Sequence, residues 1–164
     1  MADVSRLTTE QALNVLRSNT GLVQSVAALA QTRVEAVAFG PSQIIAQNAA
    51  AEVLERTDAA EYPAVYVYCE KITNLLREKF RTFSGESHMV IETRVSSESL
   101  EGLHRELQLY ASAVTQVLDQ SRGSWGNGMY YTGGYEVTYG SARRGGKNYI
   151  QTAKATFEVQ VSIS

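Results

Sequence analysis

Hydrophobic positions recur at helical spacing in the second half of the chain and then alternate with polar positions to its end. Between residues 99 and 120, the apolar residues are separated by three or four positions: Leu100, Leu103, Leu107, Tyr110, Val114 and Val117. This spacing predicts one long amphipathic helix. The last apolar residues alternate with polar ones: Phe157, Val159, Val161 and Ile163. They predict a strand with one buried face that is built into a sheet. The helix is expected to pack on that sheet, although a seam with another subunit is the alternative.

The first sixty residues carry helical patterns. Thr8 and Gln11 resemble a capping box, and apolar residues continue from Leu13 to Leu29 on either side of a break at Gly21. We therefore expect a helix that ends near Gly21 and a second helical piece after it. A short β-like run, Val34 to Phe39, is closed by Gly40-Pro41. Ser42 then stands where an N-cap belongs, before residues at helical spacing: Ile44, Ile45, Ala49, Val53 and Leu54.

Strands are predicted after residue 60. Tyr62 to Cys69 carries apolar or aromatic side chains on both faces, which is typical of a strand covered on both sides and near the middle of a sheet. Lys79 to Phe83 and Met89 to Val95 flank a turn-like segment, Ser84 to Ser87, and together they predict a β-hairpin.

These elements predict an α+β fold. A mostly antiparallel sheet would be packed by the long amphipathic helix, with an additional helical region at the N-terminal side. The length of 164 residues fits one domain, 1–164. Within it, residues 1–60 would be mainly helical and residues 61–164 would form the sheet and the long helix.

Composition narrows the function classes. The formal net charge is −2, which argues against extensive nucleic-acid binding because that requires a strong basic excess. Cys69 is the single cysteine, so the sequence offers neither an internal disulfide nor a zinc cluster of cysteines. No apolar run reaches the length of a membrane span and no signal peptide is recognised, so we expect a soluble protein made in the cytoplasm.

No group of residues has the spacing of a catalytic, cofactor or metal site. Eight of the twelve glycines lie between Gly123 and Gly146, but they lack the pattern of a phosphate-binding loop. His88 and His104 have no metal-ligand spacing to another strong ligand, and we expect both on the surface. Cys69 is expected to be a small buried side chain.

Two segments are candidate interfaces. Arg143, Arg144 and Lys147 cluster with glycines at the expected tip of a hairpin between Tyr135–Tyr139 and Tyr149–Ala153. The cluster is either a solvated turn or a projecting tip that reaches an acidic surface or a nucleic-acid backbone. Residues 120–164 hold five basic residues against two acidic ones, and such asymmetry suits stacking of unlike faces.

The second candidate is a loop rich in aromatic residues. It contains Trp125, Met129, Tyr130 and Tyr131. These side chains must pack inward or against a partner, because large exposed aromatic clusters mark interfaces.

The order of elements resembles the tail terminator and neck proteins of long-tailed bacteriophages. The residues that carry the likeness are the strand Tyr62–Tyr68, Thr93-Arg94-Val95 before the helix Leu100–Leu118, the loop Ser124 to Gly128, and the strand Tyr135–Tyr139 paired toward Phe157-Glu158-Val159. Residues 42–60 are longer than the family's compact version requires.

The resemblance implies a structural subunit of the virion tail or neck, without catalysis or cofactor. Such subunits form a ring, usually a hexamer, at the head-proximal end of the tail tube. There the ring stops tube polymerisation and offers a docking surface for the head connector. The implied partners are copies of the chain itself, the tail tube protein and connector or neck proteins, with passing contact to DNA in the lumen and no membrane.

Two other classes remain open at this point. One is a head-side connector, adaptor or other virion assembly module, and the other is an enzyme. The ring interpretation further suggests that Arg143, Arg144 and Lys147 contact a neighbouring ring or the lumen, while Trp125 and Tyr130 anchor packing near a subunit boundary.

Overall fold

A computed structural model describes residues 3–33, 37–57 and 60–164. In these residues seven strands form one sheet, in the order β1-β2-β3-β7-β5-β4, with β6 paired to β7. All pairs are antiparallel except β1 with β2, which is parallel. With the helices α1 to α4, this confirms the predicted α+β fold.

The strands β3 (Phe83–Ser97) and β7 (Asn148–Ile163) form the centre of the sheet. They pair without interruption from Phe83 opposite Ile163 to Ser97 opposite Tyr149. β2 (Ala64–Asn74) lies on one side of them, and β5 (Met129–Tyr139) with β4 (Gly123–Gly126) lies on the other. Tyr135 lies opposite Phe157, so the predicted pairing of these two strands is confirmed.

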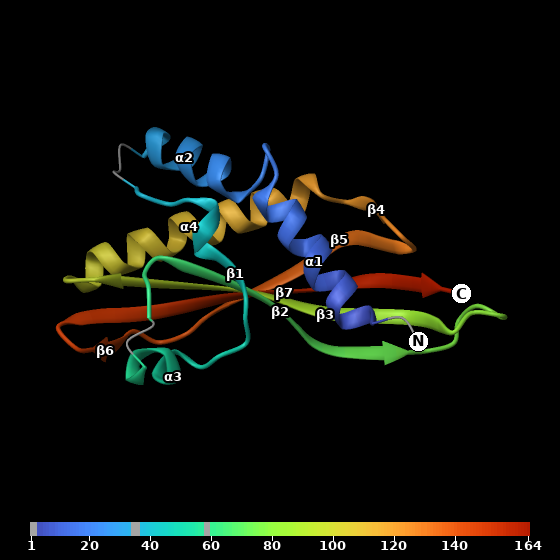
Figure 1. Ribbon diagram of the computed structural model, residues 1–164. Coiled ribbons are helices and arrows are strands. Elements are labelled where there is room, and N and C mark those ends of the chain that lie inside the picture. Colours follow the sequence, from blue (N-terminus) through green and yellow to red (C-terminus); the bar gives the residue numbers. More distant parts are fainter. Residues whose placement is uncertain (1–2, 34–36, 58–59) are drawn as a thin grey trace.

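One face of the sheet is covered by α1 (Val4–Arg17) and α4 (Leu100–Gln120), and α2 (Leu22–Thr32) forms a further layer on that side. α4 packs on β3 and β7, and α2 lies over α4 on the side away from the sheet (Figure 1). α4 is therefore buried on two sides, with Leu109 and Ala113 buried in addition to the predicted stripe. Leu100 is the exception in that stripe, because it is exposed at the first turn. None of the helices in the described residues combines the length and apolar character that crossing a bilayer requires.

The N-terminal helices confirm the predicted break at Gly21, but the predicted start of α1 is wrong. Asp3 caps the helix by accepting a hydrogen bond of 3.1 Å from the backbone N–H of Arg6. Thr8 lies one turn further on and is buried. Its hydroxyl bonds to the carbonyl oxygen of Val4 and to the hydroxyl of Ser87 on β3. Thr8 therefore fixes α1 on the sheet.

The segment after Gly40 differs from its prediction. Pro41–Gln43 forms a 3₁₀ turn, Ile44–Ala46 forms the strand β1, and α3 is confined to Ala51–Arg56. Ile44 and Ile45 pair in parallel with Val65 and Tyr66 of β2, and this edge pairing outweighs the helical spacing of the run. Residues 34–36 of the predicted β-like run lie outside the described residues, and Val37 to Gly40 has no regular structure.

Two predictions about β2 and β3 are also corrected. β2 lies beside the short edge strand β1 and not in the middle, although Ala64 to Val67 is buried on both faces as predicted. Ser84 to Ser87 is not a turn, because β3 continues through it from Phe83. A Cβ atom on Gly85 would lie 1.9 Å from the carbonyl oxygen of Thr73. Glycine is required there by the close approach of β2.

Candidate functional site

The loop between β2 and β3 presents apolar side chains to solvent. Leu75, Leu76 and Phe80 on this loop and Ile72 near the end of β2 are exposed, and we call these four side chains the hairpin tip. Phe80 is 99% exposed and Leu76 is 64% exposed. Both have positive φ angles, +64° and +49°, which are strained for residues other than glycine.

The backbone that carries the hairpin tip is held by hydrogen bonds. The Asn74 side-chain oxygen accepts from the backbone N–H groups of Leu76 and Ser84, at 3.2 and 3.1 Å. Its side-chain nitrogen donates to the carbonyl oxygen of Thr82 at 3.0 Å. The backbone N–H of Thr82 donates to the carbonyl oxygen of Ile163 at 2.9 Å. The apolar side chains are therefore displayed on an ordered loop.

The predicted basic tip exists, but its three cations have different surroundings. β6 (Arg143–Gly145) pairs with the start of β7, and the turn between them holds Gly146, with φ of +72°, and Lys147. Arg143 forms ion pairs with Glu55 at 2.9 Å and with Glu52 at 3.7 Å, both on α3. Its hydrogen bond to Glu55 raises the pKa of Arg143. Arg144 lies over the Tyr149 ring, and Lys147 is exposed.

The aromatic loop divides into core and surface. Trp125, Met129 and Tyr131 are buried, and the Trp125 ring packs against those of Tyr131 and Phe157. The Trp125 indole N–H donates to the carbonyl oxygen of Ser121 at 2.8 Å. Tyr130 points the other way and is 49% exposed. Inward packing is therefore confirmed for Trp125 and Tyr131, and Tyr130 is the exposed member of the predicted pair of anchors.

The sheet face opposite the three helices carries a buried ion pair. Glu92 and Arg94 of β3 are only 5% exposed and form a salt bridge. Tyr68 donates its hydroxyl to Glu92 at 3.1 Å, and Lys154 lies 3.6 Å from the same carboxylate. The Arg94 guanidinium also covers the Tyr66 ring and donates to the carbonyl oxygen of Ala49. Burial and the neighbouring Glu92 raise the pKa of Tyr68.

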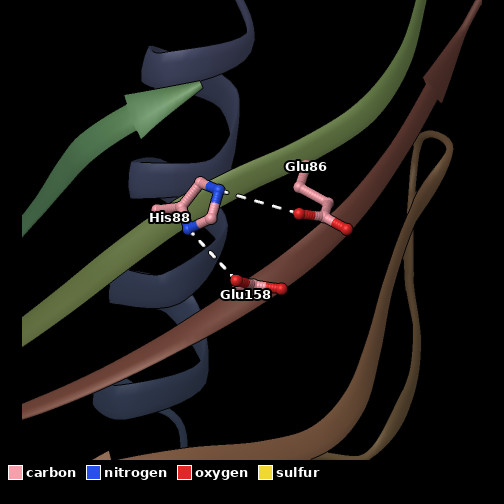
Figure 2. A group of neighbouring side chains, drawn as sticks. All are labelled: Glu86, His88 and Glu158. Carbon is pink, nitrogen blue, oxygen red and sulfur yellow. Dashed lines mark ion pairs between the residues drawn. The ribbon is translucent and has the colours of Figure 1, made fainter. Parts of the chain in front are cut away.

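A second polar cluster lies further along the same face (Figure 2). His88 of β3 stands between the carboxylates of Glu86 and Glu158, and it is half-buried instead of fully solvated as predicted. Because the sequence predicts a turn at Ser84 to Ser87, it gives no reason to expect Glu86 beside His88 on one strand. In a strand, positions 86 and 88 share one face, and that alternation was the available signal.

The remaining single residues agree in part with their predictions. His104 is exposed on α4 and lies 3.1 Å from Gln108. Cys69 is a free thiol that is half-buried and lies 3.3 Å from the Ser87 hydroxyl.

Comparison with known proteins shows a likeness at the level of structure. No protein-family profile matches this chain, and no curated protein sequence matches it. Among solved structures, a chain from a virion of native gene transfer agent (GTA) particle is similar. The alignment has 14% sequence identity and a TM-score of 0.49, and it covers 98% of this chain and 99% of that chain.

Proposed function

We propose that this protein is a structural subunit of a phage-type virion, located in the tail or neck. Copies of it form a ring, of six subunits as in the tail terminators it resembles, at the head-proximal end of the tail tube. The ring ends tube polymerisation and joins the tail to the head connector. This role requires neither catalysis nor a cofactor, and its partners are the tube protein, the connector and the passing DNA.

The observation that carries the proposal is the hairpin tip. Leu75, Leu76 and Phe80 project from the end of the sheet on a hydrogen-bonded loop and have no packing role in the core. Burying such side chains against a partner is worth about 1.5–3 kcal/mol each. Surface patches of this kind mark sites of protein association.

The placement of the two candidate surfaces suits a ring. The hairpin tip follows the end of the sheet where Phe83 pairs with Ile163, whereas the basic turn lies at the end where Ser97 pairs with Tyr149 (Figure 1). A ring closes when two different patches on each subunit meet around an axis. An apolar patch and a basic turn at opposite ends of one sheet supply unlike patches.

Replacing Phe80 with serine tests the proposal. Phe80→Ser changes a side chain outside the core, so the circular dichroism spectrum should stay as in the wild type. The mass measured by light scattering should fall from that of an oligomer to that of a monomer. Leu100→Ser is the matched control, because Leu100 is also exposed but lies on α4. Equal assembly of Phe80→Ser and wild type would contradict the proposal.

A further inference from the structure

The sheet register brings one imidazole and two carboxylates together on two central strands. His88 of β3 lies directly opposite Glu158 of β7, and Glu86 is two residues before His88 on the same face of β3. Strands in the centre of a sheet hold their side-chain origins rigidly. The cluster is therefore positioned by the backbone and does not depend on a loop.

The distances within the cluster are short. His88 Nδ1 lies 3.2 Å from Glu158 Oε1, and His88 Nε2 lies 3.7 Å from Glu86 Oε2. One ligand atom from each of the three residues can be chosen so that all lie within 4.8 Å of one another. Figure 2 shows the two carboxylates converging on the imidazole ring from different strands.

The surroundings of the cluster favour a cation. A hollow of about 350 Å³ lies beside His88 and Glu158, and two further acidic residues, Glu70 and Glu136, are among those that line it. The hollow occurs where the β5–β7 register is interrupted between Tyr131 and Tyr135, an irregularity of the kind often found at functional sites. The hollow leaves open space in which a bound ion could complete its coordination with water.

We propose that Glu86, His88 and Glu158 bind a divalent transition-metal ion, for which Zn²⁺ is the probe. Zn²⁺ takes imidazole nitrogen and carboxylate oxygen ligands at about 2.0–2.2 Å, usually in a tetrahedron. Neighbouring ligand atoms of such a tetrahedron are roughly 3.4 Å apart, close to the two distances in this cluster. The two carboxylates face different ring nitrogens, so one of them must turn. Glu158 has the freedom to do so because its side chain is 54% exposed, against 19% for Glu86 and His88.

Arg77 sets the strength of the site. Its guanidinium pairs with Glu86 Oε1 at 2.9 Å and so competes with a metal ion for that carboxylate. Removing this cation leaves the cluster more negative. Arg77→Ala is therefore expected to bind Zn²⁺ more tightly than the wild type.

Competition with a chromophoric zinc indicator measures the binding. The wild type should take up one Zn²⁺ per chain at the site. Loss of an outer partner of a metal ligand alone costs about 10–100-fold in affinity, so loss of a ligand in His88→Gln or Glu158→Gln should weaken binding by at least that factor. His104→Gln is the matched control, since the chain has two histidines and His104 lies on α4. It should bind like the wild type.

Either of two results would contradict the proposed metal site. One is a wild type that takes no Zn²⁺ from the indicator, and the other is His88→Gln binding as tightly as His104→Gln. Circular dichroism of each variant tests whether it is folded. If His88→Gln does not fold, Glu158→Gln takes its place in the comparison, because it changes an exposed side chain. The inference does not rest on the assembly role, because monomeric Phe80→Ser can be titrated in the same way.

Discussion

Arg143 donates a hydrogen bond of 2.9 Å to Glu55, which joins the basic turn to a helix 88 residues earlier in the sequence. Arg143, one of the three basic residues predicted to contact a partner, is therefore already paired with a carboxylate of its own chain. Lys147 lies at the end of the same turn and remains exposed. The contributions of Arg143 and Lys147 can therefore be measured separately with single variants.

Arg143→Ala should lower the free energy of unfolding by about 0.2–1 kcal/mol, the usual range of an exposed ion pair. Lys147→Ala should change it by less than about 0.5 kcal/mol, as for most surface substitutions. Urea unfolding measures both values. If Lys147 contacts a neighbouring ring, Lys147→Glu should impair joining of tails to heads while leaving stability unchanged. Normal joining by Lys147→Glu would remove Lys147 from the interface.

Trp125→Ala should destabilise the fold by about 3–5 kcal/mol, because it opens a cavity beside Tyr131 and Phe157. Tyr130→Ala should cost much less, since half of that side chain is already in solvent. Thermal unfolding compares the two variants. A subunit-boundary role for Tyr130 predicts that Tyr130→Ala loses assembly while its circular dichroism spectrum stays that of a folded protein. Unfolding of both variants at the same temperature would contradict the division of this loop into core and surface.

Removing Arg94 should destabilise the protein strongly. Arg94→Met takes away the closest cation of the buried Glu92 carboxylate and leaves Lys154, at 3.6 Å, as its charged partner; breaking a buried pair typically costs about 3–5 kcal/mol. The double variant Glu92→Gln with Arg94→Met removes both charges and should recover part of the loss. Denaturant unfolding of the two single variants and the double variant gives the coupling. Strictly additive effects would show that the two side chains act independently.

Raising the pH above 10 should weaken the fold. Burial raises the pKa of Tyr131 to about 12, and burial with the nearby Glu55 raises that of Tyr62 to about 12. Both are above the ordinary tyrosine value of 10. Each neutral hydroxyl therefore stabilises the native state below pH 10, and this contribution is lost as the pH rises from about 10 to 12. Absorbance titration of tyrosinate and urea unfolding across this interval test the effect. Tyr131→Phe, which cannot ionise, should lose less stability over the interval than the wild type.

The long helix and the last strand were predictable because their patterns are long and regular. The apolar spacing from Leu103 to Val117 and the alternation from Phe157 to Ile163 each persist over several periods. Ile44 to Ala46 was misinterpreted because three residues cannot distinguish the two periods. Their strand conformation depends on pairing with Val65 to Val67, each of which lies 21 residues after its partner in the sequence.

The candidate sites were harder to predict for a related reason. Ser84 to Ser87 has the composition of a turn, yet Gly85 serves a close approach to Thr73 and Ser87 bonds to Thr8. Because of these long-range contacts the loop lies at residues 75–82 instead, and it carries Leu75, Leu76 and Phe80 of the hairpin tip. The same displacement places Glu86 and His88 on one strand face. The cluster of Arg143, Arg144 and Lys147 is recognisable in the sequence by its charge. The ion pair of Arg143 with α3 depends on the tertiary structure, so the sequence does not predict it.

The most direct test of the assembly role is the mass of the purified protein in solution, alone and after mixing with tail tubes that lack a terminator. Light scattering on a size-exclusion column should give a discrete species several times the 18.0 kDa chain, about six times for a hexamer. Negative-stain images should show rings, free or at one end of the tubes. A protein that stays at 18.0 kDa and leaves both tube ends bare would contradict the proposed function.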